Sequence, residues 1–73
     1  MDTTKRYVVY ELKKDGRVID YGWVTRDLVQ RNGELNTILK GDGLELRILP
    51  PTEGMEEIQA KEIWSELKSK LNQ

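Results

Sequence analysis

The sequence predicts an α+β protein with three antiparallel strands and two helices in the order β-β-α-β-α. Asp15-Gly16 is a turn pair between two β-rich runs, which predicts a β-hairpin. Apolar and charged residues alternate over 44–49, which predicts a third strand. Apolar residues recur at helical spacing over 25–40 and 52–71. The first strand is apolar on much of both faces, which suits a central strand, so we expect strand order 2-1-3 with a right-handed crossover and a two-layer sandwich with both helices on one face of the sheet.

The hairpin over residues 5–24 predicts which side chains share a face. A two-residue loop of Asp15-Gly16 requires a type I′ turn, so the numbers of paired residues should sum to 31, as 15 and 16 do. Alternate residues of a strand point to the same face. One face, which we expect to form the core beneath the helices, pairs Leu12 with Ile19, Tyr10 with Tyr21, and Val8 with Trp23. The other face pairs Lys13 with Val18, Glu11 with Asp20, Val9 with Gly22, and Tyr7 with Val24.

Residues 25–40 carry an interrupted helical pattern. Thr25 is a suitable N-cap for it. Asn32-Gly33 falls inside the pattern, where glycine costs about 1 kcal/mol relative to alanine. The segment is therefore either one broken helix or a loop followed by a short helix from about Gly33. The apolar stripe consists of Leu28, Leu35, Ile38 and Leu39.

A second helix is predicted after Pro50-Pro51, which ends the third strand. Thr52 is placed to cap this helix, with acidic residues near its positive end. Met55 and Ile58 lie off its apolar stripe, so either the first turn bends or these two side chains contact something else. The stripe itself consists of Ala60, Ile63, Trp64, Leu67 and Leu71.

Length and composition predict one domain, residues 1–73, with residues 1–4 as a flexible tail. The sequence has no cysteine and no histidine, which excludes disulfides and Ser-His or Cys-His catalytic pairs and removes the usual zinc ligands. We therefore expect a non-enzymatic protein without metal or cofactor. There is no apolar leader and no run of about 18 apolar residues, so we expect a soluble, cytoplasmic protein that does not enter a membrane.

The predicted pairing of Glu11 with Asp20 sets two like charges opposite each other, which is unfavourable on a sheet. Three interpretations remain open. In the first, Lys13 and Arg47 neutralise the two carboxylates on a solvated face. In the second, the pair meets a lysine or arginine of a partner at an interface. The third, a cation or acid/base site, is the weakest because two carboxylates alone seldom hold a divalent ion.

The face that carries Glu11 and Asp20 is the candidate interaction surface. Its apolar residues predict a patch on the side of the sheet that the helices leave open, and contiguous exposed apolar residues often mark an interface. Gly22 would let a partner or a neighbouring ring approach closely. We expect this face to bind another protein or a second copy of the chain, with packing beneath the N-terminal tail as the alternative. The interaction candidates are Tyr7, Val9, Glu11, Val18, Asp20, Val24 and Arg47.

Nucleic-acid binding is the alternative function. A hairpin with basic and aromatic side chains is one way to hold nucleic acid. The net charge of −1 provides no overall attraction, however, and the predicted core takes up Tyr10, Tyr21 and Trp23. We therefore expect nucleic acid to be the less favoured partner. Its candidate residues are Lys5, Arg6, Lys13, Lys14 and Arg17.

Together these observations predict a small regulator or inhibitor that acts by binding another protein. Homodimerisation is compatible with this prediction, because a domain of this size is marginally stable alone. Its small size suits an accessory protein encoded by a phage or mobile element.

Overall fold

The computed structural model describes residues 5–71. The strands form one antiparallel sheet in the order β2-β1-β3. The predicted α+β class, element order and strand order are therefore confirmed. The predicted tail, residues 1–4, lies outside the described residues. The elements are β1 (Tyr7–Lys14), β2 (Arg17–Thr25), α1 (Leu28–Leu39), the short 3-10 turn η1 (Lys40–Asp42), β3 (Leu44–Ile48) and α2 (Glu57–Leu71).

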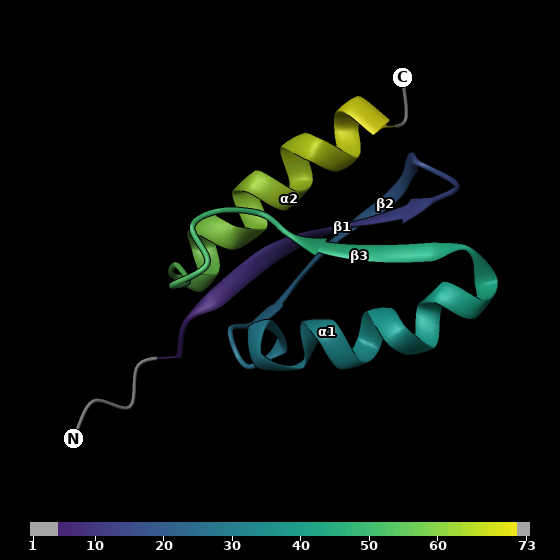
Figure 1. The fold of residues 1–73 in the computed structure, drawn as a ribbon. Coiled ribbons are helices and arrows are strands. Elements are labelled where there is room, and N and C mark those ends of the chain that lie inside the picture. Colours follow the sequence, from purple (N-terminus) through teal and green to yellow (C-terminus); the bar gives the residue numbers. More distant parts are fainter. Residues whose placement is uncertain (1–4, 72–73) are drawn as a thin grey trace.

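The two helices lie on opposite sides of the sheet rather than together on one face, which corrects the predicted arrangement of layers (Figure 1). Val8 and Val9 give the physical reason. As neighbours in β1 they point to opposite faces, and both are buried, with 0% and 1% of their surface exposed. A central strand that is apolar on both sides needs cover on both sides.

The Asp15-Gly16 turn forms as predicted. Its two residues have φ values of 52° and 83°, both positive as a type I′ turn requires. Next to the turn, Lys14 pairs with Arg17 and Lys13 pairs with Val18, in the predicted register. The Asp15 N–H also donates to the Gly43 carbonyl at 3.1 Å, which holds the turn against the start of β3.

Beyond Lys13 the register shifts by one residue. Leu12 pairs with Asp20, and Ile19 is the extra residue of a β-bulge. The predicted pairs in this part of the hairpin are therefore wrong by one residue, because the bulge interrupts the alternation of β2 at Ile19. The observed pairs are Glu11–Tyr21, Tyr10–Gly22, Val9–Trp23, Val8–Val24 and Tyr7–Thr25.

The shift separates two aromatic residues that were predicted to share the core face. Trp23 joins Val9 on the α2 side of the sheet, whereas Tyr10 lies on the other side, opposite Gly22. A Cβ atom at Gly22 would overlap the Tyr10 ring, so the ring lies directly against the glycine backbone. Gly22 thus admits a neighbouring ring, one of the two roles predicted for it.

The main core lies between α2 and the sheet. Its buried members are Val9, Met55 and Ala60. Trp64 ties α2 to β2, because its Nε1 donates to the Tyr21 carbonyl at 2.9 Å. The half-buried residues that pack around this core are Tyr7, Trp23, Leu49 and Leu67.

The loop before α2 also belongs to the core. Met55 and Tyr7 exchange two backbone hydrogen bonds of 2.8 Å, so Met55 contacts β1 instead of lying in a helix. Because α2 begins at Glu57, Thr52 does not cap it, and that prediction is wrong. Ile58, by contrast, faces solvent and is 68% exposed.

α1 is one continuous helix, so of the two predicted alternatives the single helix is present, without a break at Asn32-Gly33. Thr25 is the last residue of β2, and Asp27 takes the N-cap position without a side-chain hydrogen bond. A Cβ atom at Gly33 would meet nothing within 4 Å, so this exposed glycine weakens the helix without breaking it. No residue within Leu28–Leu39 is fully buried.

Candidate functional site

The seven protein-interaction candidates do not form one exposed face. Val9 is 1% exposed and Glu11 is 8% exposed, both on the α2 side. Tyr7 packs beside Trp23, with ring centroids 5.5 Å apart. Val24 lies on the opposite side of the sheet. By register Val18 and Arg47 share the α2 side with Tyr7, Val9 and Glu11, whereas Asp20, like Val24, pairs with a residue of the other side. The prediction of an open face with these residues together is therefore wrong, because α2 covers the side on which five of the seven lie.

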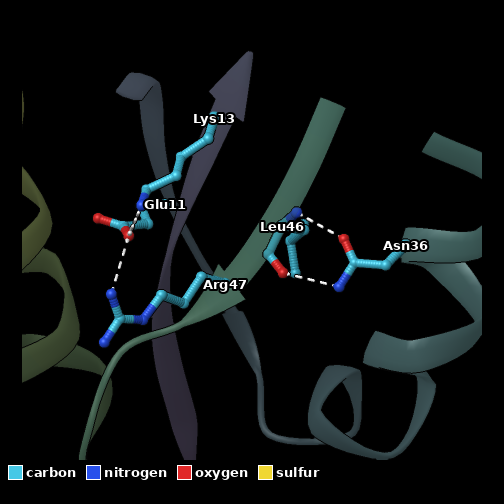
Figure 2. Close-up of polar contacts among 5 residues, drawn as sticks. All are labelled: Glu11, Lys13, Asn36, Leu46 and Arg47. Carbon is cyan, nitrogen blue, oxygen red and sulfur yellow. Dashed lines mark hydrogen bonds and ion pairs between the residues drawn. The ribbon is translucent and has the colours of Figure 1, made fainter. Parts of the chain in front are cut away.

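Glu11 does not lie opposite Asp20. It pairs with Tyr21, and its Oε1 lies 3.9 Å from the Lys13 Nζ and 3.7 Å from the Arg47 Nη1 (Figure 2). Lys13 and Arg47 therefore neutralise Glu11, as the first of the three interpretations required, but Glu11 is buried rather than solvated and Asp20 pairs with Lys68 instead. The structure does not bring the two carboxylates together, so the cation or acid/base site that needs both of them is not formed.

Asp20 takes part in a half-exposed ion pair at the edge of β2. Its Oδ1 accepts a hydrogen bond from the Lys68 Nζ at 2.7 Å and one from the Tyr21 N–H at 2.8 Å. These bonds, that of Lys68 first, hold the pKa of Asp20 below its ordinary value because they stabilise the carboxylate. Asp20 therefore ties α2 to the edge strand.

The β-bulge moves Ile19 onto the surface, where it is 42% exposed. Lys14 and Arg17 form the last pair of the hairpin beside it, and both are exposed. Together with Asp15 these residues line an open hollow of about 370 Å³. We define the hairpin-tip surface as Lys14, Asp15, Arg17 and Ile19. It presents one exposed apolar side chain beside two cations and one carboxylate, a net charge of +1 that suits an acidic protein surface.

The basic nucleic-acid candidates lie at the two ends of the hairpin. Lys5 and Arg6 precede β1, whereas Lys14 and Arg17 lie at or beyond its far end, across a strand of eight residues, about 26 Å at 3.3 Å per residue. Lys13 belongs to the ion pair with Glu11 described above. These residues therefore do not form one continuous basic surface.

At the base of the hairpin, Lys5, Arg6 and Arg26 line a hollow of about 270 Å³. Both arginine side chains donate to backbone carbonyls of the loop before α2, at 3.2 and 3.3 Å, which limits their movement. Asp27 also lines this hollow, so its three cations and one carboxylate leave a net charge of +2.

Asn36 is a residue whose role the sequence analysis missed. From α1, its Oδ1 accepts from the Leu46 N–H at 2.6 Å, and its Nδ2 donates to the Leu46 carbonyl at 2.9 Å (Figure 2). The side-chain amide thus occupies the outer edge of β3 as a neighbouring strand would. Asn32 and Asn36 interrupt the apolar stripe of the helix four residues apart, and this interruption is the signal that could have indicated the role.

Comparison with protein-family models, with curated proteins and with solved structures finds no match to this chain. Within residues 5–71, neither helix has the length and apolar character needed to cross a membrane.

Proposed function

We propose that the chain is a small, non-enzymatic protein-interaction module, a regulator or inhibitor, that binds another protein through the hairpin-tip surface. The observation that carries the proposal is the exposure of Ile19 on a β-bulge. Bulges redirect side chains and are over-represented beside functional sites. The proposed setting is the cytoplasm, because a chain without cysteine suits a reducing compartment.

The proposed partner has acidic side chains around a small apolar depression. Full burial of an isoleucine side chain contributes about 2 kcal/mol. Ile19 would contribute less to binding, because its side chain is already half-covered in the free protein. Lys14 and Arg17 repel each other across the strand pair, and carboxylates of the partner would relieve this repulsion. Charges at the rim of an interface mainly raise the association rate, so binding should weaken as salt is added.

The hairpin tip is held in place before a partner arrives. The type I′ turn fixes two residues in positive φ, and the hydrogen bond from Asp15 to Gly43 joins the turn to β3. A surface that is already ordered loses less conformational entropy on binding than a flexible loop does. This favours recognition by the tip over recognition by a mobile segment.

Site-specific photo-crosslinking in cells of the source organism tests the proposal. A benzophenone amino acid replaces Ile19 in one variant and Ile58 in the matched control, since Ile58 is an exposed isoleucine on the solvent side of α2. We expect a discrete adduct with one protein from position 19 and no such adduct from position 58. Equal adducts from the two positions would contradict the proposal.

Charge reversal then tests the role of the two cations. The K14E/R17E double substitution in the position-19 variant should reduce the yield of the adduct at least about tenfold, because it replaces attraction to carboxylates with repulsion. The matched control K70E reverses an exposed lysine near the end of α2 and should leave the yield unchanged. An adduct that survives K14E/R17E would show that the tip does not recognise an acidic partner.

Nucleic-acid binding is a second candidate function, favoured by the hollow that Lys5, Arg6 and Arg26 line. Guanidinium groups bind phosphate in a bidentate manner, and loop carbonyls already hold both arginine side chains here. Asp27 in the same hollow places this candidate second. Binding of a labelled oligonucleotide at low salt that R26E abolishes would support it, and no binding at low salt would remove it.

A further inference from the structure

One side chain closes the outer edge of β3. At an outer edge of an antiparallel sheet, the N–H and C=O groups of alternate residues point away from the neighbouring strand. In β3 these residues are Leu44, Leu46 and Ile48, because the N–H and C=O of Leu46 turn outward to Asn36. Another strand could therefore form hydrogen bonds with this edge once the Asn36 side chain has moved away from it.

The sequence of β3, Leu44-Glu45-Leu46-Arg47-Ile48, is self-complementary when it is paired with itself in the antiparallel direction. Pairing two copies around Leu46 sets Glu45 of each copy opposite Arg47 of the other. Leu44 of each copy then faces Ile48 of the other. Opposite charges and apolar residues directly across a strand pair both favour pairing.

The backbone supports the same register. When two copies pair around Leu46, the residues whose N–H and C=O groups point outward meet one another, Leu46 with Leu46 and Leu44 with Ile48. Each of these pairs can exchange two hydrogen bonds. Charge complementarity and hydrogen bonding therefore select one and the same alignment.

α1, which carries Asn36, is loosely held. No residue within Leu28–Leu39 is fully buried, and the N-cap residue Asp27 makes no side-chain hydrogen bond. Gly33 lies in the interior of the helix, where it lowers helix stability. Elements with few buried contacts open at low free-energy cost, so α1 is suited to withdraw from the edge.

The other edge of the sheet is closed more firmly. The Tyr21 carbonyl of β2 accepts from the Trp64 Nε1, and the Tyr21 N–H donates to Asp20. Trp64 belongs to α2, whose Ala60 is fully buried against the sheet. Opening this edge would require α2 to leave the main core, so association through β3 is favoured over association through β2.

We propose that the β3 edge binds the β3 edge of a second copy of this chain when α1 withdraws Asn36, which joins two three-stranded sheets into one symmetric sheet. The side-chain amide of Asn36 thus blocks a site of self-association until it is displaced. This inference does not rest on the proposed function, because it uses no residue of the hairpin-tip surface.

Sedimentation equilibrium of the full chain and its variants tests whether Asn36 prevents dimerisation through β3. N36A removes the amide, and N36D keeps an acceptor for the Leu46 N–H but cannot donate to the Leu46 carbonyl. We expect the dimer dissociation constant of both variants to be at least about tenfold lower than that of the wild type, which corresponds to about 1.4 kcal/mol. The control T37A changes the neighbouring exposed residue, whose hydroxyl bonds within α1, and should not dimerise more tightly.

Charge reversal in the N36A or N36D background tests the register, with the amide NMR spectrum used to confirm that each variant is folded. E45R should weaken dimerisation at least about tenfold, because it sets two arginines opposite each other across the dimer axis. The double reversal E45R/R47E should restore it when its amide spectrum shows the folded domain, a check that matters because R47E also removes the cation beside Glu11 of its own chain. The proposal is overturned if neither variant of Asn36 dimerises more tightly than T37A, or if E45R leaves dimerisation unchanged.

Discussion

At the scale of single residues, Gly22 and Tyr10 fix the register of the hairpin. The Tyr10 ring lies where a Cβ atom at position 22 would be, so a side chain at position 22 conflicts with the ring. In a hairpin without a bulge, Tyr10 would face Tyr21 and no glycine would lie beneath the ring. The bulge therefore places a glycine where the ring requires one, which strongly favours the observed pairing.

This contact makes G22A a specific test. We predict that G22A lowers the free energy of unfolding by about 1–3 kcal/mol, because the new methyl group forces the Tyr10 ring out of its position. The matched control G33A meets no atom within 4 Å and should raise stability by up to about 1 kcal/mol through helix propensity. Urea unfolding measures both, and equal midpoints for G22A and the wild type would show that the ring does not pack on Gly22.

The ion pair of Asp20 with Lys68 predicts a dependence of stability on pH. Folding lowers the pKa of Asp20, chiefly through the Lys68 bond. The pair therefore stabilises the fold above the unfolded-state pKa, about 3.9, and the contribution is lost as the pH falls through the lower folded-state pKa. The side chain is half-exposed, so D20N should cost about 0.2–1 kcal/mol at pH 7.

Urea unfolding at a series of pH values checks this expectation. The difference between D20N and the wild type should shrink as the pH falls below the folded-state pKa, since the protonated carboxyl no longer pairs with Lys68. D42N, which changes an exposed residue of η1, is the matched control and should show no such trend. A D20N effect that is the same at acid and neutral pH would contradict the assignment.

At the scale of elements, the two helices are attached to the sheet in different ways. α2 contributes Ala60 to the core and Trp64 to the edge of β2. α1 contributes half-buried side chains and the amide of Asn36 to β3. The described chain therefore has one firmly packed helix and one that is held mainly at the edge of the sheet.

Hydrogen exchange measures this difference. We predict that backbone amides within Leu28–Leu39 exchange at least about tenfold faster than those in the centre of β1, because no side chain of α1 is fully buried and Gly33 weakens the helix. Native-state exchange followed by NMR resolves the two sets of amides. Equal protection in α1 and β1 would show that the helix opens only with the whole domain.

The elements were predictable to the extent that they follow a regular pattern. The turn at Asp15-Gly16 was predicted from local turn chemistry, and the strand order from the apolar residues on both faces of β1, which suit a central strand. Thr25 and Thr52 were assigned as helix caps by residue type, but strand pairing extends β2 through Thr25, and Met55 contacts β1 before α2 begins. Those two boundaries depend on tertiary contacts that no local pattern contains.

The candidate surface was less predictable than the fold. A single bulge residue interrupts the alternation of β2 at Ile19, so that residues 20–25 point to the face opposite the one that a regular hairpin predicts. The sequence therefore could not assign Val9 to the α2 side with Trp23 or Ile19 to the surface. The sequence does show an amide, Asn36, within the apolar stripe of the helix. It does not show the long-range contact with Leu46 that gives this amide its role.

At the scale of the whole molecule, one shift of register organises both faces of the sheet. It gathers Val9, Tyr7 and Trp23 beneath α2, and it leaves Tyr10 on the other side of the sheet. Side chains from the helices then occupy part of each sheet edge, Asn36 at β3 and Trp64 at β2. Such cover limits unspecific pairing between sheet edges, so self-association has to await the withdrawal of Asn36.

The β-bulge at Ile19 is the central claim, because both the faces of the sheet and the hairpin-tip surface depend on it. A two-dimensional NOE spectrum in D2O tests it directly, since Hα atoms approach closely across the pairs that do not exchange hydrogen bonds. The bulged hairpin predicts strong Hα–Hα contacts between Glu11 and Tyr21 and between Val9 and Trp23. Contacts from Glu11 to Asp20 and from Val9 to Gly22, which a regular hairpin would give, would contradict it.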